Sequence, residues 1–150
     1  MAEPINLEGH NGNQTRFHLA IPVADLDAAA VFYGETLGCE RGREASQWID
    51  WNFGGHQLVT HVVPGWIGVA GTNAVDGNDV PVPHFGALLA PSSFQRLADR
   101  LRDADVSFII EPQVRFAGET GEQHTMFLLD PSGNALEFKA FADDSQVFAR

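Results

Sequence analysis

Cysteine is nearly absent from the chain: Cys39 is the only one in 150 residues, so no disulfide can form within the chain. This usage fits a reducing compartment, and we expect a cytoplasmic protein. The N-terminal stretch MAEPINLEGHNGNQTR contains no apolar core of the length that a signal peptide requires. No stretch approaches the roughly 18 consecutive apolar residues of a membrane span. We therefore expect neither export nor insertion into a membrane.

Basic residues are also scarce. Nine lysines and arginines stand against 20 acidic residues, and the formal net charge is −11. Phosphate backbones attract clustered Lys and Arg, so the composition argues against nucleic acid as a partner. It also disfavours a strongly anionic substrate, although a local pocket can override the net field. The remaining composition is ordinary, 44% apolar, and the chain is long enough to fold as one domain or as two half-sized modules without disulfides.

Apolar patterns divide the first half of the chain into four segments. In chain order they are a flexible polar tail (1–15), an alternating strand (16–23), a helix (25–38) and a hairpin around Gly54–Gly55 (47–63). In the first strand, Phe17, Leu19 and Ile21 share one face, which we expect to pack under the helix. Asp25 is placed to cap the helix N-terminus, and Gly38 fits the position after its end.

A connector rich in Gly and Pro, residues 64–83, follows, and the second half then repeats the order of the first. The connector has no strong period and is expected to be a lid or a link between the halves. The second half comprises a strand (84–90), a helix (92–106), a strand (107–114), a hairpin (124–141) and a C-terminal tail (142–150). Ser92 and Gln95 have the spacing of a helix capping box, and Gly133 supplies a positive φ in the last turn.

The two halves form an internal repeat, residues 16–63 and residues 84–141, and each has the order strand, helix, strands. The repeat predicts an α+β fold in which each helix covers one face of its own sheet. The other face of each sheet, which we call the inner face, must either bury against its counterpart or enclose a cavity.

Alternation along the strands decides which polar residues lie on the inner faces. If Leu19 and Ile21 pack under the helix, His18 points the other way, and the same parity places His84 and Glu137 on the inner face of the second half. Two histidines and one carboxylate form the ligand set of non-heme Fe(II) oxygenases, which leaves about three coordination positions open. The same ligands suit Mn(II), Ni(II) or Zn(II). A strand histidine is more often a hydrogen-bonded core residue than a ligand, so spacing alone leaves both interpretations open.

Three stretches give the chain a resemblance to a known family: FHLAIPVADLDAAAVFYGETLGC, VPHFGALL and FLLDPSGNALEFKAF. They resemble the glyoxalase / bleomycin resistance / extradiol dioxygenase superfamily, also called vicinal oxygen chelate proteins, over residues 16–141. Within it, the chain looks most like the small predicted dioxygenases of the extradiol type. The resemblance implies paired βαβββ modules whose mainly antiparallel sheets form a cup around one metal. It also implies that the metal ligands are His18, His84 and Glu137.

The chain departs from the family patterns at positions that bear on the reaction. Glyoxalase I-like members carry a fourth, carboxylate ligand where this chain has Val59, which disfavours an isomerase and keeps coordination positions free. Ring-cleaving members often use an active-site tyrosine, whereas the single tyrosine here, Tyr33, is expected under the sheet. Fosfomycin-type transferases need cationic residues for a phosphonate, and Lys139 is the one cation expected on the inner faces.

Two further histidines are candidates for moving protons. His61 shares the face of Val59, and a neutral imidazole near its ordinary pKa of about 6.5 can act as acid or base at neutral pH. A solvent-exposed strand end explains His61 equally well. His124 is expected on a loop over the mouth of the cup, where it could touch substrate. Trp48 and Trp51 have opposite parity, so one can wall the pocket while the other packs in the core.

The function expected from these features is that of a non-heme Fe(II) dioxygenase of the extradiol type, acting on O2 and a small, aromatic vicinal diol. His61 or His124 would move protons. One alternative is a glyoxalase-like isomerase or a transferase that uses Ni, Zn or Mn in the same cup. Another is a metal-free module that binds or sequesters a small molecule. The modules either close one cup within the chain or exchange between two chains, which would give a homodimer with metal sites at its interface.

Overall fold

The computed structural model describes residues 5–75 and 77–150. The elements of the first half are β1 (His18–Val23), α1 (Leu26–Ala30), the π-helical segment η2 (Val31–Thr36), β2 (Glu40–Ala45), β3 (Trp48–Phe53) and β4 (His56–Val62). Those that follow are β5 (Gly71–Val75), β6 (Asn78–Val82), β7 (His84–Leu88), α2 (Pro91–Asp103), β8 (Phe108–Arg115), β9 (Gln123–Leu129) and β10 (Ala135–Phe141). Short 3-10 turns, His10–Gly12 and Asp144–Gln146, lie in the two tails. No helix among the described residues is long and apolar enough to cross a membrane.

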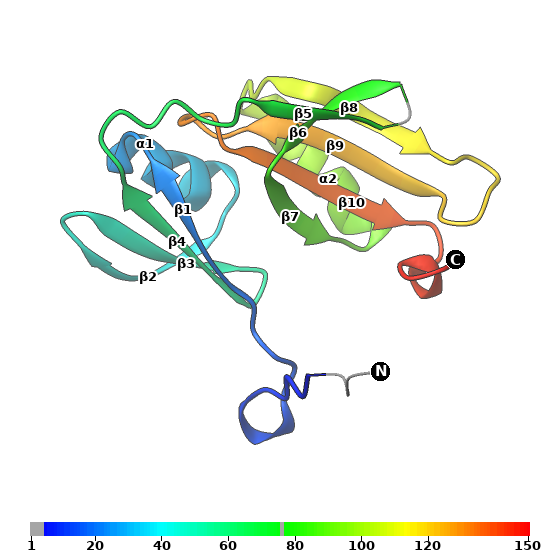
Figure 1. Cartoon of the computed structure of the whole chain (residues 1–150), viewed down its shortest axis with the longest axis horizontal. Helices are drawn as coiled ribbons and strands as arrows, with labels where there is room; N and C mark the ends of the chain where they lie inside the picture. The colour runs from blue at the N-terminus through cyan, green and yellow to red at the C-terminus, as the bar shows by residue number, and fades with distance from the viewer. Residues whose placement is uncertain (1–4, 76) are drawn as a thin grey trace.

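The strands form one four-stranded sheet in each half and a separate hairpin between them in the sequence (Figure 1). The first sheet has the order β1-β4-β3-β2 and the second has the order β7-β10-β9-β8. In each sheet the first and last strands of the module pair in parallel, and all other neighbours are antiparallel. This is the expected pair of βαβββ modules, and the α+β class is confirmed.

The first helix follows the prediction at both ends. The side chain of Asp25 caps α1 by accepting a hydrogen bond from the backbone N–H of Ala28 at 2.9 Å. Gly38 adopts a φ of 79° after the helical segment, a conformation that favours glycine. Between these ends the chain widens into the π-helix η2, which buries Phe32 and Tyr33. The tyrosine therefore lies under the sheet, as expected.

The second helix begins earlier than predicted, at Pro91, and its N-cap residue Ala90 makes no side-chain hydrogen bond. Proline at the first helical position has its φ already fixed for the helix, so the helix starts before Ser92 can cap it. The capping-box prediction is wrong, because Gln95 instead donates to Asp99 at 2.9 Å.

Phe17 precedes β1 rather than lying within it, and it is 64% exposed. Its backbone N–H donates to Nδ1 of His56 at 2.8 Å, so the chain here runs along the tip of the hairpin. The prediction that it packs under the helix is therefore wrong for Phe17. It holds for Ile21, which is buried, and for Leu19, which packs against the core.

Alternation of apolar residues does not reveal two of the strand regions. Every residue of β2 is exposed, so this strand has no apolar alternation to detect. The connector 64–83 contains the hairpin β5–β6, in which Val75 and Val80 pack with Ile110 and Phe127 of the second sheet. Phe127 pairs with Glu137 and shares its face, so the hairpin covers part of the second inner face (Figure 1).

Both helices and the helix-facing sides of both sheets contribute to one hydrophobic core. At the junction between the modules, the ring of Phe53 lies 5.9 Å from that of Phe85 and 6.1 Å from that of Phe138. The hydroxyl of Tyr33 donates to Asp130 across the same junction at 2.8 Å. Because the helix-covered sides meet in the centre, the inner faces lie on the outside of this core.

Candidate functional site

His84 and Glu137 face each other on the inner face of the second sheet. They lie on the parallel neighbours β7 and β10, where His84 pairs with Ala135 and Gly86 pairs with Glu137. The distance between His84 Nε2 and Glu137 Oε2 is 3.1 Å. A Cβ atom at Gly86 would collide with the backbone carbonyl of Glu137, so glycine permits the close approach of the two strands here.

A backbone carbonyl fixes the tautomer of His84. Nδ1 lies 2.6 Å from the carbonyl oxygen of Pro81, an acceptor, so Nδ1 must carry a proton. In a neutral imidazole Nε2 then has only a lone pair, and it points at a carboxylate oxygen that also has only lone pairs. Either a proton shared by Nε2 and Oε2 or a metal cation must therefore lie between them. An imidazole nitrogen and a carboxylate oxygen in this arrangement are fitting ligands for a divalent metal.

The carboxylate of Glu137 is held from its other side. Thr125, on the neighbouring strand β9, is buried and donates its hydroxyl to Glu137 Oε1 at 2.7 Å. Lys139 Nζ lies 3.7 Å from the same oxygen. Glu137 is only 6% exposed, and a buried carboxylate needs such partners to offset its desolvation. These contacts orient Oε2 towards His84.

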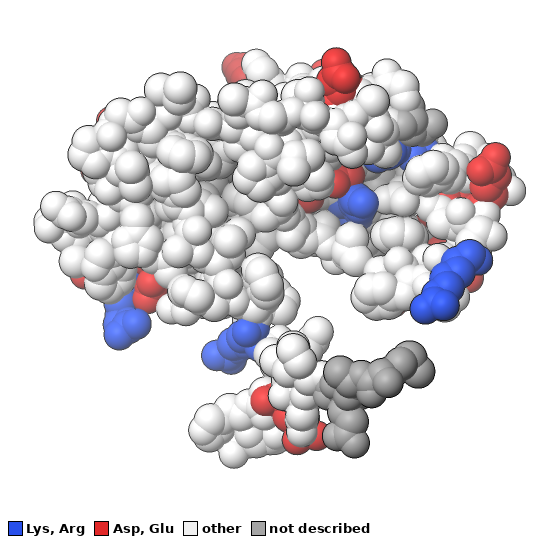
Figure 2. All heavy atoms as spheres, viewed as in Figure 1, with Lys and Arg blue, Asp and Glu red and all other residues white. Residues whose placement is uncertain are grey.

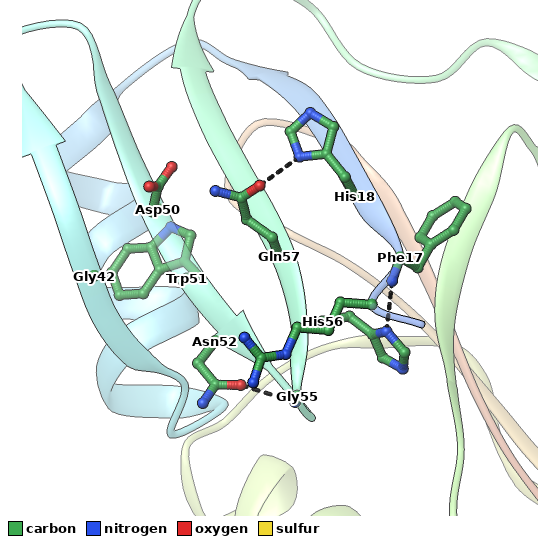
Figure 3. A pocket seen from close by; sticks show the side chains of 10 residues that line it. Phe17, His18, Gly42, Asp50, Trp51, Asn52, Gly55, His56 and Gln57 are labelled. Atoms are coloured by element: carbon green, nitrogen blue, oxygen red, sulfur yellow. Dashed lines mark hydrogen bonds between the residues drawn. The ribbon is translucent and has the colours of Figure 1, made fainter. Parts of the chain in front are cut away.

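His18 lies on the inner face of the first sheet, at the start of β1. Its Nδ1 is 2.8 Å from Oε1 of Gln57, its register partner on β4 (Figure 3). An amide oxygen accepts, so this contact also puts the proton on Nδ1 and leaves Nε2 with the lone pair. His18 is exposed and lines a hollow of about 480 Å³ together with Gln57, Asp50 and Asn52.

The structure brings two of the three predicted ligands together and leaves His18 apart from them. The residues that line the hollow of His18 all belong to the first module. A second hollow of about 250 Å³, lined by His84 and Glu137, is built only from the second module. Among residues 5–75 and 77–150, no group of three His, Cys, Asp or Glu side chains is placed to hold a metal. One chain therefore presents the predicted ligands in two separate hollows, one in each module.

The two predicted acid-base histidines lie in different surroundings. His61 is exposed on β4, where it pairs with Pro22 and Trp48, and so shares the inner face with His18. His124 lies within β9 and not on a loop, and its ring is 5.7 Å from that of Phe94 on α2. It therefore points to the helix-covered side, away from Glu137, and the prediction that it lies over the cup mouth is wrong.

The strand register shows which of the two tryptophans packs in the core and which lies on the inner face. Trp51 is 2% exposed and donates from its indole N–H to Thr60 at 3.1 Å, so it packs in the core. Trp48 is half-buried on the inner face opposite His61. It is the tryptophan that walls the first inner face.

Sequence reasoning missed several polar residues of the inner faces. The Gly54–Gly55 turn pairs Asp50 with Val59, so the hairpin pattern could have placed this carboxylate beside the predicted ligands. Arg115 pairs with Gln123 on the face of Thr125, and it is 6% exposed. The prediction that Lys139 is the one cation of the inner faces is therefore wrong. Irregular register within β8 hides the parity of Arg115 from the sequence.

Two other reactive side chains are kept in their neutral forms by burial. Burial raises the pKa of Tyr33 well above its usual value near 10, and the neighbouring carboxylate of Asp130 raises it further. Burial raises the pKa of the Cys39 thiol to about 11, although the Arg100 guanidinium acts in the opposite direction. Neither group has the ionised form that a nucleophile or base requires at neutral pH.

Charged side chains are scattered over the face shown in Figure 2, without a continuous basic patch. The sequence already argues against nucleic acid on its net charge of −11. The charge that matters locally is the carboxylate of Glu137 beside Lys139 and His84.

Comparison with known proteins identifies the relatives of this architecture. The model of the Glyoxalase/Bleomycin resistance protein/Dioxygenase superfamily matches residues 15–138. The chain is 36% identical to a glyoxalase/bleomycin resistance protein/dioxygenase from Alicyclobacillus acidocaldarius, with a TM-score of 0.73 over 88% of this chain and 95% of that one. None of the curated proteins compared with the chain matches it significantly.

More distant solved structures share the fold. The genomically encoded fosfomycin resistance protein FosX of Listeria monocytogenes is 13% identical, with a TM-score of 0.67 over 89% of this chain and 98% of that one. A glyoxalase/dioxygenase from Nostoc punctiforme is 19% identical, with a TM-score of 0.64 over 93% of this chain and 100% of that one. At these identities the likeness extends to the fold alone.

Proposed function

Because the chain belongs to the glyoxalase/bleomycin resistance protein/dioxygenase superfamily, we propose that it is a metal-dependent dioxygenase of the extradiol type. Its metal would be held by His84 and Glu137 of one chain and by His18 of a second copy. The substrates would be O2 and a small, aromatic vicinal diol whose two oxygens chelate the metal. A reducing cytoplasm would keep the proposed iron in its Fe(II) form.

The observation that carries this proposal is the convergence of His84 Nε2 and Glu137 Oε2, which lie 3.1 Å apart and can ligate one metal ion. The carbonyl of Pro81 and the hydroxyl of Thr125 fix their orientations. Outer contacts of this kind set the tautomer of a ligating histidine and the direction of a ligating carboxylate. When bound, the metal would lower the pKa of the substrate hydroxyls and bring substrate and O2 together.

A second copy of the chain would complete the ligand set. His18 has the free Nε2 atom and the exposure that a ligand needs, but it lies in a hollow of the first module only. The first inner face of one chain can close over the second inner face of another, and a two-fold axis then makes two identical cups. The proposed enzyme is therefore a homodimer with its metal sites between chains.

Two features favour a dioxygenase over an isomerase with four protein ligands. Val59, buried on the inner face next to Asp50, offers no ligand atom, so three positions stay open for a chelating diol and O2. His61 lies on the same face as His18 and is the residue that would exchange protons with the substrate. His124, on the opposite face of its sheet, has no part in the proposed site.

Metal analysis of anaerobically purified protein tests the proposal, with Glu137→Ala as the disabling variant and His124→Ala as the matched control. We expect near-stoichiometric iron in the wild type and in the control, loss of iron in Glu137→Ala, and O2 uptake with catechols only where iron is bound. Stoichiometric Ni, Zn or Mn in the wild type would instead favour the isomerase or transferase. Absence of any metal after reconstitution would favour a metal-free binding module.

A further inference from the structure

The first inner face carries a polar hollow that the three proposed metal ligands do not explain. Its volume is about 480 Å³, and the charged or polar side chains in its lining are Arg16, His18, Asp50, Asn52, His56 and Gln57. Such a volume is in the range that small ligands occupy. His18 stands at one side of this hollow, and Asp50 lies across it on β3 (Figure 3).

Asp50 is a carboxylate whose bonding is incomplete. Its side chain is only 12% exposed, yet no hydrogen bond to either of its carboxylate oxygens is found among the described residues. Its one ionic partner in the part of the chain that the structure describes is Nε of Arg43, at 3.4 Å, on a side chain that is 82% exposed. An exposed arginine at that distance contributes little, whereas a buried carboxylate without donors is costly. The site therefore favours an incoming group that carries N–H donors and a positive charge.

The backbone keeps this carboxylate accessible. Gly42 of β2 lies beside Asp50, and a Cβ atom there would be 3.2 Å from the Cβ of Asp50. A side chain at position 42 would therefore crowd the aspartate and close that side of the hollow. Glycine leaves a path to Asp50 from the edge of the sheet.

The register relates Asp50 to His18. His18 pairs with Gln57, which pairs with Asn52, and the next row of the same face joins Val59 to Asp50. Two strand spacings of about 4.8 Å and one row of about 6.8 Å along the strands therefore separate the two residues, and their Cα atoms are about 12 Å apart. Gln57 lies between them, with its carbonyl oxygen towards His18 and its amide nitrogen on the side of Asp50 (Figure 3). A one-ring molecule with a short side chain spans such a gap.

We infer that this hollow binds the end of the substrate remote from the metal, and that Asp50 receives a positively charged nitrogen there. The substrate class is then a vicinal diol that bears an ammonium or guanidinium group, which fits a protein of net charge −11. The inference rests on the proposed function, because the diol end is placed by the metal. Arg43 occupies the carboxylate when no substrate is present, and the substrate cation displaces it.

Three probes that differ at one substituent test this inference. They are 3,4-dihydroxybenzylamine, a cation, 4-methylcatechol, which is neutral, and 3,4-dihydroxybenzoate, an anion. Their dissociation constants are measured by anaerobic calorimetry on the Fe(II)-loaded full chain, as wild type, Asp50→Asn and Arg43→Gln. Circular dichroism confirms that each variant is folded.

We expect the wild type to bind the amine about tenfold more tightly than the neutral catechol, as a charge-assisted hydrogen bond to a buried carboxylate requires. Asp50→Asn should abolish this preference, and Arg43→Gln should keep or increase it. An unchanged preference in folded Asp50→Asn, or equal binding of all three probes by the wild type, overturns the inference and leaves the proposed function standing. Binding of none of the probes, by protein that also fails to take up iron, overturns both.

Discussion

The two modules share one topology but orient their histidines by different means. In the second module a backbone carbonyl, that of Pro81, holds His84, and the buried hydroxyl of Thr125 holds Glu137. In the first module the side-chain amide of Gln57 holds an exposed His18. The second module thus holds two of the proposed ligands in a partly buried pair, whereas the proposed ligand of the first module lies on an open polar surface. We propose that the two modules have different roles: the second would hold the metal, and the first would supply the third ligand and bind the substrate.

The largest effect is expected from Gly86→Ala, which should separate His84 from Glu137 by displacing the backbone between them. The new Cβ collides with the carbonyl of Glu137, so β7 and β10 must separate and His84 loses its position opposite the carboxylate. We expect a loss of about 2–3 kcal/mol in unfolding free energy, as overpacking typically causes, together with loss of metal binding. Denaturant unfolding and metal titration measure both. Val31→Ala, at an exposed position of the first helical segment, is the control that should retain metal.

Thr125→Val should have the next largest effect, because it removes the donor to Glu137 without changing the shape of the site. We expect metal affinity to fall about 10–100-fold, as for the loss of other outer contacts of metal ligands. Thr60→Val is the matched control in the first module, where the threonine accepts from Trp51 in the core. It should lower stability but leave metal affinity unchanged. Equal metal affinity in both variants would mean that Thr125 has no part in orienting the ligand.

Gln57→Leu tests the contact that orients the histidine of the first module. Mutation can remove the side-chain amide that contacts His18, whereas it cannot remove the backbone carbonyl that contacts His84. We expect the proton of His18 to move from Nδ1 to Nε2 in the metal-free protein, and metal affinity to fall about tenfold. Nitrogen chemical shifts of the imidazole report the tautomer directly. Gln57→Glu keeps the acceptor and should restore the Nδ1–H form. An unchanged tautomer in Gln57→Leu contradicts the positioning role of the amide.

The smallest effect concerns the junction that joins the modules. Because the pKa of Tyr33 is raised in the folded protein, its stabilising effect is complete below the unfolded pKa near 10 and is lost as pH rises towards the folded pKa. Stability should therefore fall above pH 10 in the wild type. Tyr33→Phe should be less stable at neutral pH by about 1 kcal/mol, from the lost hydrogen bond, and should lack this part of the alkaline decline. Denaturant melts between pH 8 and about pH 11 compare the two slopes.

Alternation in the sequence was sufficient to place His18, His84 and Glu137 on inner faces, because side-chain direction in a strand follows position directly. It could not show that the faces of His18 and Glu137 lie apart within one chain, since the packing of modules depends on contacts such as that of Phe53 with Phe138. His124 was misplaced because its strand begins one residue before it.

Other errors have equally local causes. The exposed strand β2 and the hairpin β5–β6 carry no apolar period, since the first is solvated on both faces and the second covers another sheet with only a few side chains. Asp50 was within reach of the sequence once the Gly54–Gly55 turn had fixed the register. The lack of hydrogen-bond donors to Asp50 among the described residues could not be predicted from the sequence, because the contacts of a carboxylate depend on neighbouring strands.

The shared metal site is tested most directly by mixing two inactive variants, His18→Ala and Glu137→Ala, and measuring bound metal after the chains have exchanged. If each site takes His18 from one copy and Glu137 from the other, every mixed dimer contains one intact site and one doubly defective site. Random exchange should then restore about a quarter of the wild-type metal content, although neither variant binds metal alone. A mixture of exchanged chains that still binds no metal would contradict a site completed by the second copy.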